Sequence, residues 1–535
     1  MSLPLLKEAQ DERVAFVRVS PKRRGADARV PVAWPDGGRG AKSVHALMPS
    51  RALRPGEQYR FHVDMESCIG CKCCVVACNE QNGNPAAINW RRVVEIEGGW
   101  YPQTQRSYLS MGCNHCLEPT CLQGCPVDAY SKDGLTGIVQ HSADVCIGCQ
   151  YCTWNCSYGV PQYNPERGVV GKCDMCYGRL SLDQSPACVN ACPEGAIQIE
   201  IVDVAAWRVA CDAERQPAGV PVGDGSLSAT RVTVPDGLAP NAKPQGLTHV
   251  TPAEPHWPLV VMTVLTQLSV GAFATIWLLH VLGATMRLGS AALMSLGVGA
   301  LALGASTLHL GRPIHAYRAL KMWRRSWLSR EVLLFAGFSA VAAAYAGVLW
   351  FALPGAAALG PLTVLLGASG VFASARIYRV PSRPAWNTWH TPAQFFLTAA
   401  ALGPLFAAAL GAGSPRWLAV AAASLAGLKL VLVTVRFLGL IASDRIELRG
   451  TARLLSTTLK PHFILRGVLL AGGGIVLPLL VIGADTSPGP YDAMLLAAAW
   501  ALAAAGEILE RYLFFVSTVP THLAAPYLSL NAEAA

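Results

Sequence analysis

The segment CIGCQYCTWNC, residues 146–156, decides the fold of the first half of the chain, and CIGCKCCVVAC at residues 68–78 repeats it. Both have the C-x2-C-x2-C-x3-C spacing, in which a tight loop presents three thiolates to one iron-sulfur cube and the fourth cysteine leaves toward another. Two looser tetrads lie in residues 113–125 and 173–192, and a proline follows the last cysteine of each. The four tetrads therefore predict four 4Fe-4S clusters.

Zinc sites and disulfides are the alternative explanations for so many cysteines. Zinc prefers two C-x2-C pairs separated by a spacer, and a third cysteine two residues further on has no place in its tetrahedral site. A disulfide framework is unusual among thiols spaced this closely. Sixteen of the eighteen cysteines belong to the tetrads, and we expect the other two, Cys73 and Cys211, to be small buried residues.

The composition changes at about Leu259, where long runs rich in Ala, Leu, Val and Gly begin. Several runs reach the roughly 20 residues needed to cross a bilayer. We predict eight spans, near residues 259–284, 288–308, 332–353, 360–375, 393–413, 417–441, 463–484 and 493–516. The fourth is the weakest, since only a few Pro and Gly residues at 354–361 separate it from the third. The expected fold is an α+β ferredoxin-like domain with four iron-sulfur clusters, followed by an all-α eight-helix transmembrane bundle.

The chain of 535 residues divides into five predicted segments. These are an N-terminal extension (1–55), a four-cluster ferredoxin-type domain (56–210), a Pro-rich linker (211–258), an eight-span membrane anchor with a quinone site (259–520) and a C-terminal tail (521–535). The extension has a basic patch at residues 22–24 but no apolar run behind it. We therefore expect neither a cleaved signal nor a twin-arginine export peptide.

Basic residues gather in the loops after the second, fourth and sixth spans. They are Arg312, Arg318, Lys321, Arg324, Arg325, Arg330, Arg376, Arg379, Arg383, Arg445, Arg449, Arg453, Lys460 and Arg466, whereas the opposite side has only Arg287 and Arg416. The positive-inside rule then places the clusters on the cytoplasmic face of a bacterial inner membrane, a reducing compartment in which thiols survive. The net charge of +9 is mostly a sign of topology, and we expect no nucleic-acid partner.

Polar residues are scarce inside the spans and gather at helix ends on the cluster side. A series of clusters that ends at a membrane must exchange electrons with a partner in that membrane. We therefore predict a pocket for ubiquinone or menaquinone at the cluster-side ends of the helices. His309 is the best single candidate for binding a quinone oxygen, and Glu507 is the best proton carrier unless it pairs with Arg511. The full set of candidates is His309, Arg312, Glu331, Tyr378, His390, Glu507 and Arg511. We expect no haem, because only His280 and His309 lie at a useful depth.

The cysteine half resembles the electron-transfer subunit of the dimethyl sulfoxide reductase family of molybdenum enzymes. The resemblance is carried by CIGCKCCVVACNEQN, CNHCLEPTCLQGCPVDAY, CIGCQYCTWNC, and KCDMCYGRL followed by PACVNACPEGAI. The membrane half resembles that family's eight-helix anchor through HLGRP, the SREV loop, RIYRVPSRPAWNTWHTP and GEILERYLFF. The two parts are separate polypeptides in most relatives and look fused here. Glu510 departs from the anchor pattern, which usually has glycine at this position.

The resemblance implies a nested arrangement of clusters and a quinone pocket near His309. The implied ligand sets are Cys68, Cys71, Cys74 with Cys192; Cys173, Cys176, Cys188 with Cys78; Cys113, Cys116, Cys121 with Cys156; and Cys146, Cys149, Cys152 with Cys125. It also implies a separate catalytic subunit that holds molybdopterin, so this chain would relay electrons without a substrate-converting site of its own. The chain looks closest to the cytoplasm-facing membrane sulfite dehydrogenases, which implies sulfite oxidation with quinone reduction.

Two other functions stay open. The complex could be a quinol-dependent S-oxide or N-oxide reductase, or the chain could be a self-contained ferredoxin:quinone oxidoreductase or a quinone-linked ion transporter. The absence of a Rossmann glycine motif, a flavin signature and a pterin site favours a subunit of a larger complex. The direction of electron flow stays open as well, because cluster potentials span roughly a volt for the same ligands. We expect the cluster nearest the membrane to be one held by the first or fourth tetrad or their neighbours, and the sequence does not decide which.

Overall fold

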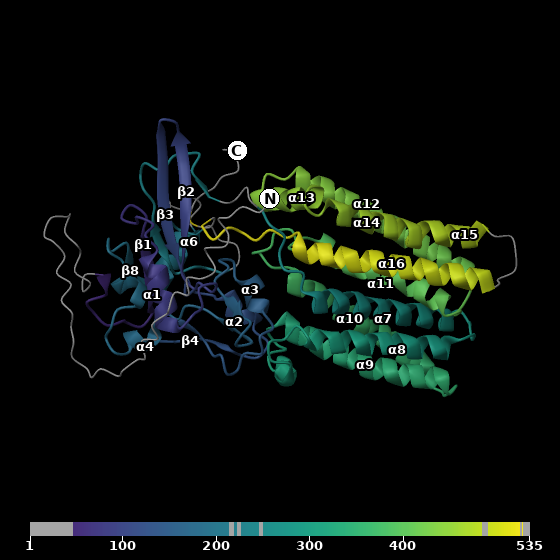
Figure 1. Ribbon diagram of the computed structural model, residues 1–535. Coiled ribbons are helices and arrows are strands. Elements are labelled where there is room, and N and C mark those ends of the chain that lie inside the picture. Colours follow the sequence, from purple (N-terminus) through teal and green to yellow (C-terminus); the bar gives the residue numbers. More distant parts are fainter. Residues whose placement is uncertain are drawn as a thin grey trace, which may run out of the picture. The chain divides into compact units, whose positions relative to one another are not determined.

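The computed structural model describes residues 47–212, 219–221, 226–245, 250–483, 490–524 and 527. Most of the predicted N-terminal extension, with its basic patch, lies outside the described residues, as do parts of the linker and of the tail. The described residues form a cysteine-rich α+β domain followed by an all-helical region, as predicted (Figure 1).

Short strands and short helices alternate in the cysteine-rich domain. In chain order they are β1 (Glu57–Asp64), α1 (Cys73–Asn82), β2 (Arg92–Trp100), β3 (Gln103–Met111), α2 (Thr120–Gly124), β4 (Tyr130–Lys132), β5 (Val139–His141), α3 (Tyr151–Asn155), β6 (Gln162–Asn164), β7 (Val169–Gly171), α4 (Tyr177–Leu180), α5 (Ala187–Asn190), β8 (Ile197–Asp203), α6 (Val204–Asp212), β9 (Arg231–Thr233) and β10 (Lys243–Pro244). Many elements are short because cysteine loops interrupt the chain between them.

Two three-stranded sheets organise this domain, with the orders β8-β1-β9 and β10-β2-β3. β1 is buried on both faces, with Phe61 and Val63 on one side of the strand and Gln58 and Arg60 on the other. β8 pairs with β1 in antiparallel register and β9 pairs with it in parallel register. β9 and β10 come from the predicted linker, so its described residues supply an edge strand to each sheet.

The two C-x2-C-x2-C loops share one backbone conformation. Gly70 and Gly148 have φ angles of 71° and 70°, in the left-handed region that only glycine adopts without cost. Lys72 and Gln150, two residues later, are also left-handed, with φ angles of 62° and 59°, and α1 and α3 begin directly after them. This repeated turn folds each loop tightly enough to direct several thiols to one side.

The described residues include eight helices that are long and apolar enough to span a membrane, which confirms the predicted number. They are α7 (Trp257–Val281), α8 (Leu288–Thr307), α9 (Trp327–Trp350), α10 (Ala356–Tyr378), α11 (His390–Ala409), α12 (Pro415–Ile441), α14 (Lys460–Ala471) continued through a π-helical turn η5 (Gly472–Val476) into α15 (Leu477–Gly483), and α16 (Pro490–Val516). A 3-10 helix η4 (Pro313–Leu320) follows α8, and a shorter helix α13 (Ile446–Ser456) follows α12.

The weakest predicted span is a complete helix of 23 residues, α10. Gly355 precedes its first residue with a φ angle of 116°, and Pro361 lies within its second turn. α9 begins five residues before the predicted start at 332, since Ser326 marks its N-terminal boundary. Glu331, which we expected in a loop, therefore lies inside α9.

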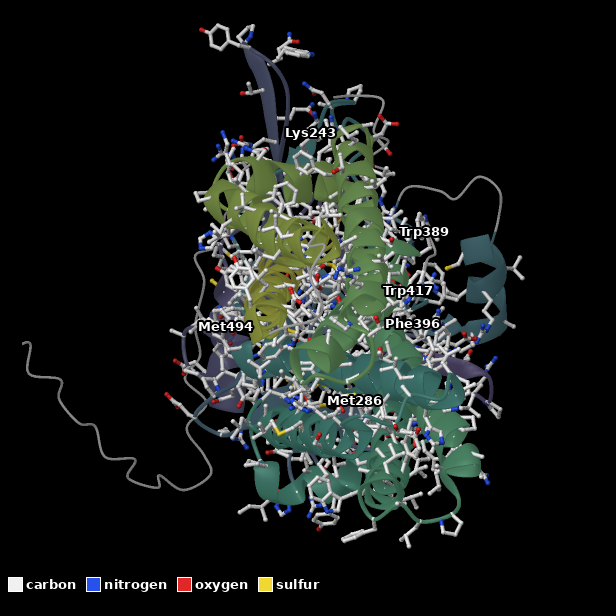
Figure 2. All side chains as sticks on the ribbon, turned by 90° about the vertical axis from the view of Figure 1, so that its right-hand side faces the viewer. Lys243, Met286, Trp389, Phe396, Trp417 and Met494 are labelled. Atoms are coloured by element: carbon white, nitrogen blue, oxygen red, sulfur yellow. The ribbon has the colours of Figure 1, made fainter. Side chains whose placement is uncertain are left out.

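Large apolar side chains cover the outside of the bundle. Met286, Trp417 and Met494 are 70%, 76% and 71% exposed, and they are labelled in the view that faces the end of the bundle (Figure 2). A soluble protein seldom exposes so much contiguous apolar surface. The exposure fits helices whose outer faces contact lipid.

Three glycines bring the cysteine-rich domain into backbone contact with the bundle. The amide of Gly311 donates to the carbonyl of Gly148 at 3.4 Å, and the next amide, of Arg312, donates to Ile147 at 3.1 Å. A β-carbon on Gly311 would overlap the backbone of Gly168, and one on Gly148 would lie 2.9 Å from the α-carbon of Gly311. The approach is possible only because none of the three positions has a side chain.

Replacing Gly311 with alanine should separate these backbones. We expect the free energy of unfolding to fall by roughly 1–3 kcal/mol, the usual cost of overpacking a close contact. Thermal unfolding in detergent micelles measures the change. Gly297→Ala in α8 is the matched control, because nothing lies within 4 Å of its added methyl group. An unchanged unfolding midpoint for Gly311→Ala would show that the contact between the two halves is not tight.

Candidate functional site

The cysteine thiols gather in four groups, each of which joins distant parts of the chain. Burial raises the pKa of Cys68. The nearby thiols of Cys74, Cys192 and Cys71 raise it further. Burial also raises the pKa of Cys78. Among the neighbouring thiols, that of Cys173 raises this pKa most, and those of Cys188 and Cys176 raise it less. Cys192 and Cys78 thus each lie beside cysteines from the other end of the domain.

The second and third tetrads form the other two groups. Burial raises the pKa of Cys121, and its neighbours Cys156, Cys113 and Cys116 add to the effect. Burial likewise raises the pKa of Cys152, which lies near Cys149, Cys146 and Cys125. In both groups the fourth cysteine comes from the other tetrad.

These groups fit iron-sulfur clusters by the chemistry of their donors. Thiols that are buried together resist ionisation, because burial and mutual repulsion both disfavour the thiolate. Iron removes this cost, since it binds the thiolate form and balances its charge. Among the described residues no three His, Cys, Asp or Glu side chains converge on a site for a single metal ion.

The groups follow one another in a line. Arg91 lies near Cys74 of the first group and near Cys188, Cys173 and Cys78 of the next. Cys173 in turn lies near Cys113, which belongs to the group of Cys121. Tyr130 lies near both Cys121 and Cys152, and so it joins the last two groups. The four groups therefore form one continuous series, from that of Cys68 to that of Cys152.

The two ends of this line have different surroundings. Cys71, in the first group, is exposed. At the other end, the core around Cys146 and Cys152 includes Ala319, Leu328 and Val332 from the helical half. We expected the cluster nearest the membrane to be held by the first or fourth tetrad or their neighbours. The thiols that lie against the helical half are instead those of the third tetrad, Cys146, Cys149 and Cys152, with Cys125 of the second.

A cavity of about 240 Å³ lies between the Cys149 loop and the helices α7 to α10. Cys149, His309, Glu331 and Tyr378 contribute to its wall. The rest of the lining is mostly apolar and includes Tyr151, Trp154, Leu259, Met262, Leu303, Leu328, Phe335 and Ile377. The volume is somewhat below the roughly 300–1,000 Å³ of pockets for drug-sized ligands, which suits a single ring.

His309 lies just beyond the end of α8, where the chain turns toward the cysteine loop. Burial lowers its pKa to about 4, so the imidazole is neutral at neutral pH and can either donate or accept a hydrogen bond. Its Nδ1 atom has no hydrogen-bond partner among the described residues. A buried nitrogen without a partner at a cavity wall is suited to bind a ligand atom.

Glu331 and Tyr378 face the same cavity from α9 and α10. Both are buried, at 6% and 3% exposure. The ring of Tyr378 packs 5.9 Å from Trp154 of the cysteine-rich domain and 5.5 Å from Trp386. Three polar groups predicted from the sequence, on three different elements, therefore meet beside Cys149.

The other four predicted residues are not part of this cavity lining. Arg312 donates to the carbonyl oxygen of Ala143 at 2.8 Å, which makes it part of the contact between the two halves. His390 stacks on Trp389 with ring centroids 3.8 Å apart. Glu507 and Arg511 lie on α16, further inside the bundle.

Glu507 does not pair with Arg511, which the sequence left as an alternative to a proton-carrying role. Lys429 of α12 forms a buried ion pair with Glu507 instead, and Thr398 donates to the same carboxylate at 2.7 Å. Arg511 donates to Gln267 at 3.1 Å and lies over the ring of Phe395. Lys429 was missed, although a single cation inside a long apolar run is itself a signal of a buried partner.

Two further expectations are corrected. Cys73 is exposed rather than buried, because it lies at the first residue of α1 on the outer side of its loop, whereas Cys211 is buried as expected. Arg466, which we counted among the loop cations, lies within α14 and is only 3% exposed. The helix begins at Lys460, earlier than the apolar pattern suggested.

Both halves of the chain match known protein families. Residues 104–201 match a model described as 4Fe-4S dicluster domain, and residues 252–516 match one described as DMSO reductase anchor subunit (DmsC).

Curated relatives match the cysteine-rich half. One chain of the anaerobic dimethyl sulfoxide reductase of Haemophilus influenzae is 39% identical over 156 residues, which are 28% of this chain and 76% of the relative. The chain of the same name from Escherichia coli K12 is 40% identical over 154 residues, 27% of this chain and 75% of the relative. One subunit of the sulfite dehydrogenase of Allochromatium vinosum is 34% identical over 160 residues, 26% of this chain and 67% of the relative.

These matches, the grouped thiols and the eight apolar helices agree with one another. The chain belongs to the dimethyl sulfoxide reductase family, as an iron-sulfur electron-transfer subunit fused in one polypeptide to a membrane anchor subunit.

Proposed function

We propose that this chain relays electrons through four 4Fe-4S clusters between a molybdopterin catalytic subunit and a quinone bound in the cavity beside Cys149. The observation that carries the proposal is that Cys149 and His309 line the same cavity. A quinone ring held there would lie against the last cluster of the line. The proposed ligand sets are the four groups of neighbouring thiols, with Cys192, Cys78, Cys156 and Cys125 as the crossing ligands.

The clusters, when bound, would supply one-electron transfer. Reduction of a quinone also needs two protons, and these must come from the protein or from water. His309 would donate a hydrogen bond to one quinone oxygen, and Tyr378 would hold the ring against Trp154. Glu331 would pass protons to the reduced oxygens, since it is the acidic residue in the cavity wall.

We propose sulfite as the substrate of the catalytic subunit, with electrons flowing toward quinone. The support is a likeness to a sulfite dehydrogenase subunit, together with basic loops that favour a cytoplasmic position of the clusters at a bacterial inner membrane. A quinol-dependent S-oxide reductase is the second candidate, because the dimethyl sulfoxide reductase relatives share more identical residues with this chain.

Purification of the intact complex tests the assignment. We expect a large molybdenum-containing subunit to copurify with this chain, and sulfite to reduce the clusters in the complex. The second candidate would be favoured if sulfite does not reduce the clusters, and if dimethyl sulfoxide reoxidises clusters that dithionite has reduced. A lone chain that is fully active with a soluble ferredoxin would overturn both assignments.

Replacing His309 with alanine removes a hydrogen bond to quinone, a loss of roughly 1–3 kcal/mol in binding, and slows proton transfer as well. We expect quinone-coupled turnover to fall at least tenfold, while artificial dyes still exchange electrons with intact clusters. His390→Ala is the matched control, since this histidine also lies at a helix end but stacks on Trp389 outside the cavity. Normal quinone kinetics in the His309 variant would place the pocket elsewhere.

Iron analysis tests the ligand sets. The intact chain should contain about sixteen iron atoms, four for each proposed cluster. Cys149→Ser should damage one cluster and interrupt transfer to quinone, which electron paramagnetic resonance and iron content would both record. Cys73→Ser should leave the iron content unchanged, because this exposed thiol belongs to none of the sets. Loss of a cluster in the Cys73 variant would show that the first set is wrong.

A further inference from the structure

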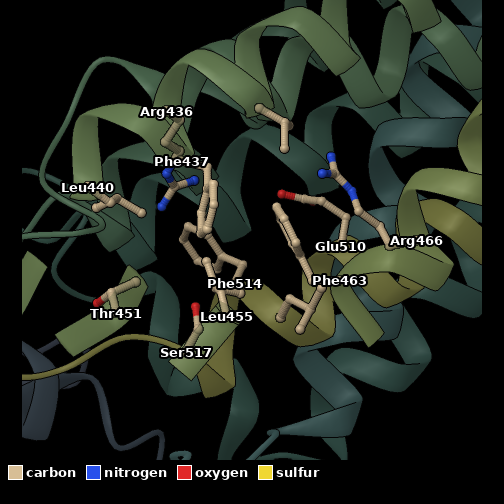
Figure 3. Close-up of a pocket in the computed structure, with 12 residues that line it drawn as sticks. Arg436, Phe437, Leu440, Thr451, Leu455, Phe463, Arg466, Glu510, Phe514 and Ser517 are labelled. Atoms are coloured by element: carbon tan, nitrogen blue, oxygen red, sulfur yellow. The ribbon is translucent and has the colours of Figure 1, made fainter. Parts of the chain in front are cut away.

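A second pocket lies on the other side of the bundle, between α12, α13, α14 and α16 (Figure 3). We call it the arginine pocket, because Arg436 of α12 and Arg466 of α14 enter its wall, with Glu510 of α16 beside them. The guanidinium groups of the two arginines come from opposite sides in Figure 3. Most of the remaining wall is apolar and consists of Val433, Phe437, Leu440, Leu455, Phe463, Leu513 and Phe514.

The charges around this pocket do not balance within the described part of the chain. Lys429 and Glu507 form one ion pair, and Arg511 lies 3.6 Å from Glu510 in another. Arg436 and Arg466 have no carboxylate within 4 Å in the same residues. Two guanidinium groups therefore face a pocket whose single carboxylate already has a cationic partner.

Of the two arginines, Arg466 is the more costly to bury. It is 3% exposed, and its Nε and Nη2 atoms have no hydrogen-bond partner among residues that the structure describes. Arg436 donates to the carbonyl of Ala385 at 3.0 Å, which accounts for one of its five N–H groups. A buried cation without a partner is expensive in a membrane protein, and an anion between the two guanidinium groups would offset that cost.

The size of the pocket restricts this anion. The pocket holds about 50 Å³, and one water molecule needs roughly 10–15 Å³ by the same measure. A group of a few atoms, such as a phosphate, therefore fits, whereas a quinone ring does not. Arginine is also the residue that binds phosphate best, because its planar fork makes two parallel hydrogen bonds.

The surroundings of the pocket favour a lipid as the source of the phosphate. Outward-facing apolar residues continue from the pocket along both flanking helices, with Val435 and Leu438 of α12 at 51% and 59% exposure and Ile464 and Val468 of α14 at 53% and 61%. α13 lies between these helices in sequence, at the cluster-side end of the bundle, and it carries the exposed Arg449. Basic pockets between helices at this level are typical sites for anionic headgroups.

We propose that the arginine pocket binds the phosphate of an anionic phospholipid, whose acyl chains lie along the exposed apolar faces of α12 and α14. This site is separate from the quinone cavity and does not depend on the proposed electron-transfer function. The lipid would join α12, α14 and α16, next to the buried Lys429–Glu507 pair.

The test uses the full chain with its clusters, stripped of lipid in dodecyl maltoside. Dioleoylphosphatidylglycerol, dioleoylphosphatidylcholine and inorganic phosphate are added separately, and bound lipid is counted by native mass spectrometry while the unfolding midpoint is followed. We expect one phosphatidylglycerol to be retained and to raise the midpoint, with a smaller effect of phosphatidylcholine and none of phosphate.

Variants then locate the site. Arg466→Gln and Arg436→Gln should each weaken phosphatidylglycerol binding at least tenfold, whereas Arg449→Gln, a neighbouring exposed arginine, should change it less than twofold. Glu510→Gln removes the one carboxylate in the pocket and should strengthen binding. It also keeps the test decisive if Arg466→Gln does not fold.

Three results would overturn the proposal. Equal effects of the two lipids would show that headgroup charge is not recognised. Equal protection by inorganic phosphate would make the pocket a site for the free anion instead. Equal losses in all three arginine variants would reduce the effect to general surface charge.

Discussion

The backbone contact among Gly148, Gly168 and Gly311 is the constraint on which the rest of this structure depends. It brings the loop that ends α8 against the loop that presents Cys149, with hydrogen bonds between the two main chains. His309 is only two residues from Gly311, so the same contact places its imidazole at the cavity wall. Side chains at these positions would hold the two halves further apart, and a longer path would slow the transfer of electrons.

Buried charge is balanced differently in the two halves of the molecule. In the cysteine-rich domain, Arg91 is 1% exposed, and although burial alone lowers its pKa, the neighbouring thiols raise it overall. Lys172 is similarly buried, and it favours the ionised form of Cys113. These cations offset the negative charge that bound thiolates bring. In the bundle, by contrast, Arg466 is buried in a pocket whose one carboxylate, Glu510, lies within 4 Å of Arg511 but not of Arg466. Among the described residues, only the arginine pocket therefore needs an anion from outside the chain.

The sequence predicted well those features that depend on residues close together in the chain. The tetrads and the eight apolar runs are local patterns, and even the weak fourth run forms a complete helix, α10, although Pro361 lies inside it. Predictions that depended on the partner of a side chain were less secure. Glu507 pairs with Lys429, which lies 78 residues away, and Arg312 binds the cysteine-rich domain rather than a ligand cavity. Cys73 is exposed because its position in the loop, and not its size, decides where its thiol points.

By itself, the sequence determined the kind of cofactor and the number of spans. Both follow from chemistry that a short segment carries, namely thiolate spacing and hydrophobic length. Only the tertiary structure decided that His309, Glu331 and Tyr378 share one cavity with Cys149, and that Arg436 and Arg466 share another. These residues belong to different helices, and which faces of the helices meet is set by packing over the whole bundle, including backbone contacts that no local pattern records.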